Sequence, residues 1–120
     1  MKLKNSEILF EDNHLIIVNK NTGVLVQGDI TGDLCLIDIT KEYLKNKYNK
    51  KGNAFLGLVN RIDRPTSGIV IFAKTSKALS RMNEKLRNRK IRKIYWLIIS
   101  NKLHPDYGKI EGWFKKNKKQ

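Results

Sequence analysis

The chain has 120 residues, a formal net charge of +14, 40% hydrophobic residues and 30% charged residues. This length allows one domain, and this balance is that of a soluble globular protein, which excludes wholesale disorder. No apolar run approaches the roughly 20 residues of a membrane span, and the first residues lack the apolar core of a signal peptide. We therefore expect no membrane association and a cytoplasmic location.

The positive charge is concentrated in the second half of the chain. Residues 1–60 carry 8 lysines, no arginine and 7 acidic residues, whereas residues 61–120 carry 17 lysines and arginines against 4 acidic residues. A neutral half joined to a basic half predicts a polyanion-binding surface, with nucleic acid as the first candidate. A general abundance of lysine is the alternative, but it accounts less well for six arginines that all follow residue 60.

The first predicted elements are two short strands and a helix. Residues 8–10 and 14–18 are apolar and flank an Asp- and Asn-containing turn at 11–13, which indicates a strand, a tight turn and a second strand. Residues 31–33, Thr-Gly-Asp, offer a helix N-cap, and a helix is predicted from there to Tyr48. Its apolar stripe consists of Leu34, Ile37, Tyr43, Leu44 and Tyr48.

Two apolar runs and a second helix follow. Residues 55–59 and 69–73 are of strand length and are typical of strands buried on both faces. A helix is predicted over 75–90, capped by Thr75 or Ser76, with charged side chains around an apolar face.

The last predicted elements are a strong strand at 94–99 and a weaker one at 108–114. The lysine-rich residues 115–120 have nothing to bury. Together these elements predict an α+β fold, with a mixed, largely antiparallel sheet and two helices.

The loop between the two apolar runs holds most of the polar candidates. Residues 60–68 read Asn-Arg-Ile-Asp-Arg-Pro-Thr-Ser-Gly, and polar groups between two buried strands are well placed for function. In an extended strand, Arg61 and Asp63 project on one face and Ile62 turns into the core. The arginine favours the ionised carboxylate, which suits a nucleophile or a general base. From these residues alone, a surface ion pair on a rigid turn is the favoured interpretation.

No pattern in the sequence indicates a metal or a cofactor. Cys35 is the only cysteine, and with the two histidines it forms no zinc pattern of familiar spacing. Its apolar neighbours indicate a buried structural thiol. There is no glycine-rich phosphate-binding loop, and Ser67 has no histidine near it in the sequence.

Residues 61–68, Arg-Ile-Asp-Arg-Pro-Thr-Ser-Gly, resemble the Arg-Leu-Asp-x-x-Thr-Ser-Gly signature of the RluA-type RNA pseudouridine synthases. Residues 15–23 are similar to the family's early strand, which ends in Asn-Lys-Pro-x-Gly, and residues 68–75 are similar to the strand after the signature. Residues 93–96, Lys-Ile-Tyr-Trp, resemble the family's Lys-x-Tyr-x strand. The four segments stand in the family's order over nearly the whole chain.

The resemblance implies an enzyme that isomerises uridine to pseudouridine in structured RNA (ribosomal or transfer RNA), with no cofactor and no metal. Asp63 falls on the catalytic aspartate, Arg61 on the arginine that helps fill the place of the flipped-out base, and Tyr95 on the tyrosine that stacks on the target base. Arg64 and Thr66 are expected as further substrate contacts. Base flipping is required because the reacting bond is inaccessible inside a helix. The basic half would hold the RNA backbone.

The chain departs from the family pattern in sequence and in length. Asn60 stands where the family usually has His, and Asn21 where it has Pro. Nothing after Tyr95 matches the family's later Gly-Arg-x-His-Gln-Ile-Arg-like motif, and an S4 RNA-binding domain is missing from the N-terminus. We therefore interpret residues 1–114 as a partial pseudouridine synthase catalytic domain, an incomplete catalytic core, and residues 115–120 as a disordered basic tail.

Two other interpretations fit the same residues. One is a catalytically inactive, truncated remnant that only binds RNA, through residues 61–120. The other is a truncated product that does not fold stably, because central strands without partners leave apolar edges open.

Overall fold

The computed structural model describes residues 1–102 and 104–117. Its strands are β1 (Ile8–Glu11), β2 (Leu15–Lys20), β3 (Gly57–Leu58) and β4 (Gly68–Ala73). They form one sheet in the order β1-β2-β4-β3, and all neighbours in it are antiparallel. The helices are α1 (Leu36–Lys47) and α2 (Ser76–Arg87), and a 3-10 turn, η1 (Asn5–Glu7), precedes β1. The predicted α+β class, with a largely antiparallel sheet and two helices, is confirmed.

The pairing of β2 with β4 brings two distant loops together. The Asp12 carboxylate accepts hydrogen bonds from the N–H groups of His14 and Leu15, both at 2.7 Å, and so closes the predicted turn between β1 and β2. From this turn β2 runs alongside β4, until Lys20 lies opposite Gly68. The turn after β2 and the loop before β4 therefore meet at the same end of the sheet.

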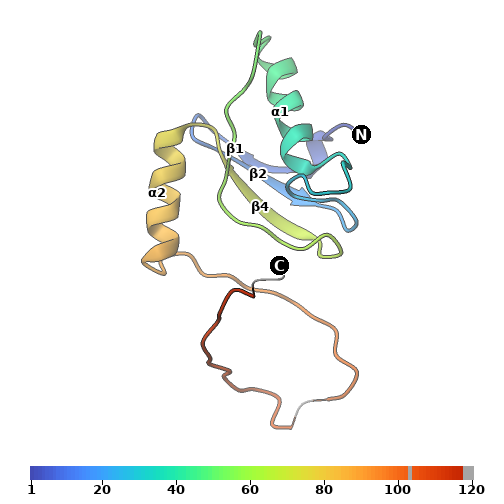
Figure 1. Ribbon diagram of the computed structural model, residues 1–120, viewed down its shortest axis with the longest axis vertical. Helices are drawn as coiled ribbons and strands as arrows, with labels where there is room; N and C mark the ends of the chain where they lie inside the picture. Colours follow the sequence, from blue (N-terminus) through green and yellow to red (C-terminus); the bar gives the residue numbers. More distant parts are fainter. Residues whose placement is uncertain (103, 118–120) are drawn as a thin grey trace.

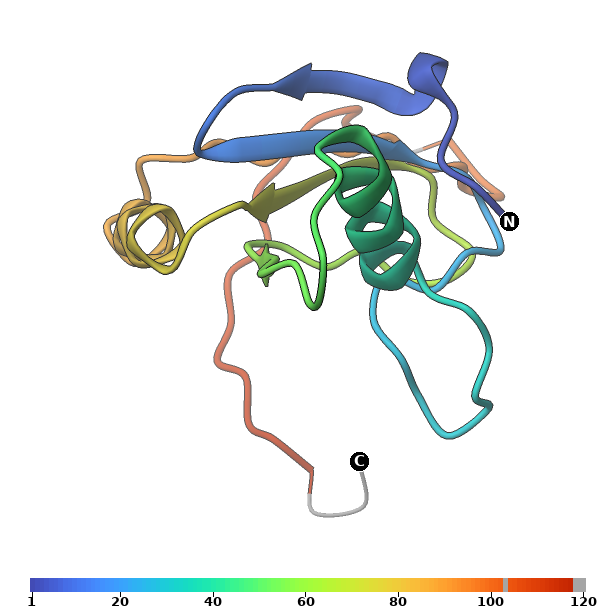
Figure 2. The same ribbon diagram turned by 90° about the horizontal axis from the view of Figure 1, so that it is seen from above.

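The two helices pack against different parts of the sheet: α1 lies over one face, and α2 stands beside the end of the strands where β4 finishes (Figures 1 and 2). On one face, Ile16 and Val18 of β2 and Val70 and Phe72 of β4 are fully buried, and they form the main core with Leu36 and Leu44 of α1. On the other face, a smaller cluster forms around Ala73, with α2 packed against it. Successive residues of a strand point to opposite faces, so β2 and β4 contribute to both clusters.

The two helices begin in different ways. The Thr75 hydroxyl accepts a hydrogen bond from the Ala78 N–H at 3.1 Å, which confirms the predicted cap of α2. The helix ends at Arg87, slightly before the predicted residue 90. The predicted cap of α1 at 31–33 is wrong, because α1 begins at Leu36. Backbone carbonyls at residues 25 and 26 accept the first N–H groups of this helix, so no side-chain cap is needed.

Three strand predictions need correction. Residues 55–59 yield only the two-residue edge strand β3. The predicted burial on both faces is incomplete in both segments, because Phe55 and Ile69 are exposed. The segments 94–99 and 108–114, predicted as strands, have no regular structure. They run in the long excursion below the sheet in Figure 1, where no strand of the described chain pairs with them. Of the predicted tail, residues 118–120 lie outside the described residues.

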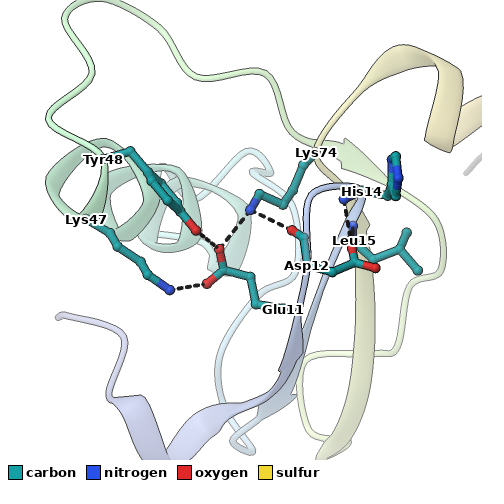
Figure 3. A network of polar contacts seen from close by, with 7 residues as sticks. All are labelled: Glu11, Asp12, His14, Leu15, Lys47, Tyr48 and Lys74. Atoms are coloured by element: carbon teal, nitrogen blue, oxygen red, sulfur yellow. Dashed lines mark hydrogen bonds and ion pairs between the residues drawn. The ribbon is translucent and has the colours of Figure 1, made fainter.

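A cluster of polar side chains joins β1, α1 and β4 at the end of the sheet away from the loop (Figure 3). Glu11 accepts hydrogen bonds from Lys47 at 2.8 Å, Lys74 at 2.7 Å and the Tyr48 hydroxyl at 2.5 Å. Lys74 also donates to the backbone oxygen of Asp12. Burial by itself would raise the pKa of Glu11, but the three hydrogen bonds outweigh it and lower the pKa to about 2. Tyr48, predicted as a core residue, instead lies half-exposed in this cluster.

We predict that this cluster makes stability depend on acid pH. The folded-state pKa of Glu11 lies below its ordinary value of 4.5, so the stabilisation is present above pH 4.5 and is lost as the pH falls towards about 2. The loss from this carboxylate is on the order of 2–3 kcal/mol in the free energy of unfolding. Urea unfolding across this pH range measures it. Glu11→Gln will be less stable at neutral pH and show a flatter pH dependence.

Glu42→Gln is the matched control, because Glu42 is an exposed carboxylate on α1. It will keep the wild-type pH dependence, including the part that comes from Asp12 and Asp29, whose pKa values are also lowered by hydrogen bonds. A Glu11→Gln protein with the full wild-type slope would contradict the assignment.

Candidate active site

The loop from β3 to β4 is shaped by side chains where the strand ladder stops. Val59 still donates to the Ile71 carbonyl, and beyond it the Asn60 side chain takes over. Asn60 donates to the Ile69 carbonyl at 3.1 Å and accepts from the Ile71 N–H at 2.8 Å. The Thr66 N–H donates to the Asp63 carbonyl at 3.0 Å and closes a turn. Asp63 therefore stands at the first position of a hydrogen-bonded turn.

A buried lysine fastens this turn to the end of β2. Lys20 is 1% exposed, and its ammonium donates to the carbonyl oxygens of Asn21 at 3.1 Å, Val24 at 2.7 Å and Arg64 at 3.1 Å. Burial lowers the pKa of Lys20, and the negative charge of Asp63 offsets part of that effect. A lysine ammonium has three donors, so all of them serve the backbone here. Lys20 is a structural tie that binds the residue next to Asp63, the candidate catalytic residue.

Further hydrogen bonds join the same two segments. The Gly23 N–H donates to the Arg64 carbonyl at 2.8 Å, and the Thr22 hydroxyl donates to the Pro65 carbonyl at 2.7 Å. In the other direction, Arg64 donates through Nε to the Gly23 carbonyl at 3.0 Å and through Nη2 to Asp33 at 2.8 Å. Gly23 has a φ of +84°, a left-handed conformation that favours glycine. The two loops thus form one cross-linked unit.

Sequence reasoning assigned no role to Lys20, Thr22 or Gly23 individually. The available signal was the resemblance of residues 15–23 to a motif that accompanies the Asp63 signature in the same family. Two motifs that occur together are expected to meet in space, and here they do.

The cross-linked loops border an open cleft of about 870 Å³, which is within the range of small-ligand sites. Its walls are residues 25–29 and 58–64, with Lys93 added. Arg61 and Asp63 both line the cleft and are exposed, while Ile62 packs against the main core. The predicted alternation is therefore confirmed. Within the described chain no ion pair joins Arg61 to Asp63, so the two charges share the cleft without direct contact.

Tyr95 and Thr66 lie in a neighbouring cleft. This second cleft, about 500 Å³, is lined by residues 66–69 and 92–96, and Asn60 and Ile62 form a ridge shared with the first. The structure thus brings Arg61, Asp63 and Arg64 together and leaves the Tyr95 ring on the other side of the ridge. Tyr95 is 56% exposed.

No metal or membrane site is found in the part of the chain that the structure describes. Its His, Cys, Asp and Glu residues form no group of three that would hold an ion, and none of its helices is long and apolar enough to cross a bilayer. Cys35 is buried at the start of α1, where its thiol donates to Asp38 at 2.9 Å. Burial raises the pKa of this thiol, as expected for a structural cysteine.

Comparison with known proteins identifies the group to which this fold and loop belong. Residues 14–120 match the sequence profile of the RNA pseudouridylate synthase family. The chain is 40% identical over 102 residues to the ribosomal large subunit pseudouridine synthase C of Buchnera aphidicola from Acyrthosiphon pisum, covering 85% of this chain and 30% of that protein. It is 30% identical over 106 residues to a mitochondrial pseudouridylate synthase of Xenopus tropicalis, covering 88% and 32%.

The solved structure of human RNA Pseudouridylate Synthase Domain Containing 4 shares the fold. It superposes with a TM-score of 0.59 and 28% sequence identity, over 71% of this chain and 31% of the human one. This chain belongs to the RNA pseudouridylate synthase family. It spans about a third of the length of the relatives it matches.

We predict that Lys20→Met loosens the two loops. The substitution keeps the apolar stem but leaves the carbonyl oxygens of Asn21 and Val24 without their donor, and that of Arg64 with the Gly23 N–H alone. The cost is roughly 2–4 kcal/mol in the free energy of unfolding. A lower thermal midpoint, together with faster amide exchange at residues 21–24 and 63–66, would show it.

Lys2→Met is the control, because Lys2 is exposed and has no hydrogen bond or ion pair within the described chain. It will behave as wild type. Equal stability of Lys20→Met and Lys2→Met would contradict the role of the tie.

Proposed function

We propose that this chain forms the aspartate-bearing part of an RNA pseudouridine synthase, with Asp63 as the catalytic residue. The observation that carries the proposal is the joint exposure of Asp63 and Arg61 in one cleft, on a turn anchored by Lys20. A carboxylate on a rigid turn meets the need of an active site for a fixed geometry. Membership of the family supplies the reaction type.

The reaction needs little besides a positioned carboxylate. The bond from N1 of uracil to C1′ of ribose breaks, the base turns within the site, and C5 bonds to C1′. The C5 hydrogen leaves as a proton and N1 gains one, so atoms and charge balance without an external reagent. The Asp63 carboxylate is suited to attack the ribose or the base, or to remove the C5 proton. Arg61 occupies the position of the extruded base in the RNA helix.

We propose that Tyr95 reaches the Asp63 cleft when residues 92–99 pair as a strand. Apolar side chains of this segment lie in water, with Trp96 97% and Ile98 101% exposed. Such exposure is typical of a surface that another segment covers. The relatives are about three times as long as this chain, and polypeptide corresponding to their remaining part would supply the partner strands. Residues 1–114 then act as one part of a catalytic domain, with 115–120 outside its core.

The proposed substrate is ribosomal RNA of the large subunit, because that is the substrate class in the names of several bacterial relatives. Arg64 and Thr66 are proposed substrate contacts. Arg64 has one N–H bound to Gly23 and another to Asp33, yet its side chain remains 43% exposed. It is therefore able to hold the loop and to meet a phosphate with its remaining donors.

RNA binding without catalysis is the second candidate. The separation of Tyr95 from the Asp63 cleft favours it for this chain acting alone. It predicts salt-sensitive RNA binding and no isomerisation.

We expect Asp63→Asn to lower pseudouridine formation by at least about a hundredfold, because the amide neither attacks nor accepts the proton. A large-subunit rRNA transcript is incubated with the chain alone, and with the chain fused to the part of the Buchnera aphidicola relative that lies beyond the match. Carbodiimide treatment then marks pseudouridine as stops of reverse transcription.

Asp106→Asn, which alters an exposed carboxylate outside both clefts, is the control and will keep wild-type stops. No stops from the wild type in either arrangement would overturn the proposed activity. Equal stops from wild type and Asp63→Asn would overturn the role of Asp63.

A further inference from the structure

Some cations of this chain are bound within the protein and others are not. Among the bound ones are Lys20, Lys47, Arg64, Lys74 and Lys109. By contrast, residues 77–93 contain eight lysines and arginines and a single acidic residue, Glu84, which gives a net charge of +7. None of these eight cations forms an ion pair within the described chain.

Three of the free cations form a stripe along α2. Lys77, Arg81 and Lys85 follow each other at intervals of four residues and are all exposed, so their side chains project about 6 Å apart along one side of the helix. Like charges at this spacing destabilise a helix, and within the described chain the one acidic residue of α2, Glu84, forms no ion pair with them. The buried side of α2, at Ala78 and Leu79, packs against the sheet and keeps the stripe in a fixed position.

The charged segment leads directly to the candidate active site. After α2 the chain passes through Arg87, Arg89 and Lys90 and reaches Arg92 and Lys93. Arg92 lines the second cleft, and Lys93 lines both. A row of cations therefore extends from the exposed side of α2 to the rim of the cleft that holds Asp63.

The composition of this row indicates which part of an RNA it meets. Residues 77–93 contain no aromatic side chain, and aromatic groups, Tyr95 and Trp96, stand only in the second cleft at the end of the row. Surfaces for single strands combine cations with aromatic groups on which bases stack. Regularly spaced cations without aromatic groups suit the phosphates of a base-paired stem, whose bases are not accessible. We infer that the Lys77–Arg81–Lys85 stripe and residues 87–93 bind the phosphate backbone of a duplex next to the target uridine. This inference rests on the proposed function for the identity of the polyanion.

The test measures binding and requires no turnover. A fluorescein-labelled RNA hairpin is titrated with wild type and with the triple variant K77Q/R81Q/K85Q, and anisotropy is followed at several salt concentrations. We expect the triple variant to bind roughly tenfold or more weakly, and the slope of log affinity against log salt to shrink by about 2 to 3. Unlabelled duplex will displace the hairpin better than poly(U).

The matched control K2Q/K41Q/K51Q removes three lysines of the first half that have no ion pair within the described chain. We expect it to change the affinity less than threefold. Equal weakening by both triple variants, no weakening by the stripe variant, or better displacement by poly(U) would overturn the inference. The charge-preserving variant K77R/R81K/K85R will bind as wild type, and circular dichroism of each variant establishes that it is folded.

The outcome separates this inference from the proposed function. The stripe substitutions will weaken binding of the hairpin by the same factor in an Asp63→Asn background, because Asp63 lies in the first cleft and the stripe lies on α2. If the protein forms pseudouridine but the stripe variant binds RNA as wild type does, the inference about the stripe is wrong and the proposed function stands. If the stripe variant binds RNA more weakly but no pseudouridine forms, the proposed activity is wrong and the inference about the stripe stands.

Discussion

The buried ammonium of Lys20 is the constraint on which the site depends. An isolated lysine inside a protein is costly, and it persists here because three backbone carbonyls surround it. One of those carbonyls belongs to Arg64, 44 residues further along the chain. The charge therefore joins the end of β2 to the Asp63 turn at a point where the strand ladder has already ended. The turn that carries the Asp63 carboxylate is thus held by an ammonium group whose three donors are all engaged in hydrogen bonds.

Other polar side chains complete the same frame. Asn60 continues the pairing of β3 with β4 through its amide, in the position where the family usually has His. Arg64 joins the loop to Gly23 and Asp33 from the opposite side. Each bond alone is worth about 1 kcal/mol, yet together they restrict one short segment from three directions. Within the described chain, the side chains of Asp63 and Arg61 form no ion pair and remain exposed in the first cleft.

The chain after α2 has a different physical character. Residues 94–99 have the composition of a strand, but a strand is stable only when its backbone groups and apolar face find partners. Within the described chain none is present, and Trp96 and Ile98 stay in water. Tyr95, in the same segment, lines the second cleft and not the cleft of Asp63. A strand-like composition is therefore not enough to form a strand, because neighbouring strands must also supply hydrogen-bond partners.

The amino-acid sequence alone determined the features that depend only on residues close together in the chain. The turn at Asp12, the cap at Thr75, the alternation of Arg61, Ile62 and Asp63, and the α+β class all follow from residue types and spacing. The Lys20 tie, the start of α1 against residues 25 and 26, and the separation of Tyr95 from Asp63 depend on segments far apart in the sequence. No local pattern encodes the Lys20 tie, because Arg64 reaches Lys20 only once β2 and β4 pair and set the register. The start of α1 is set by the backbone carbonyls of residues 25 and 26.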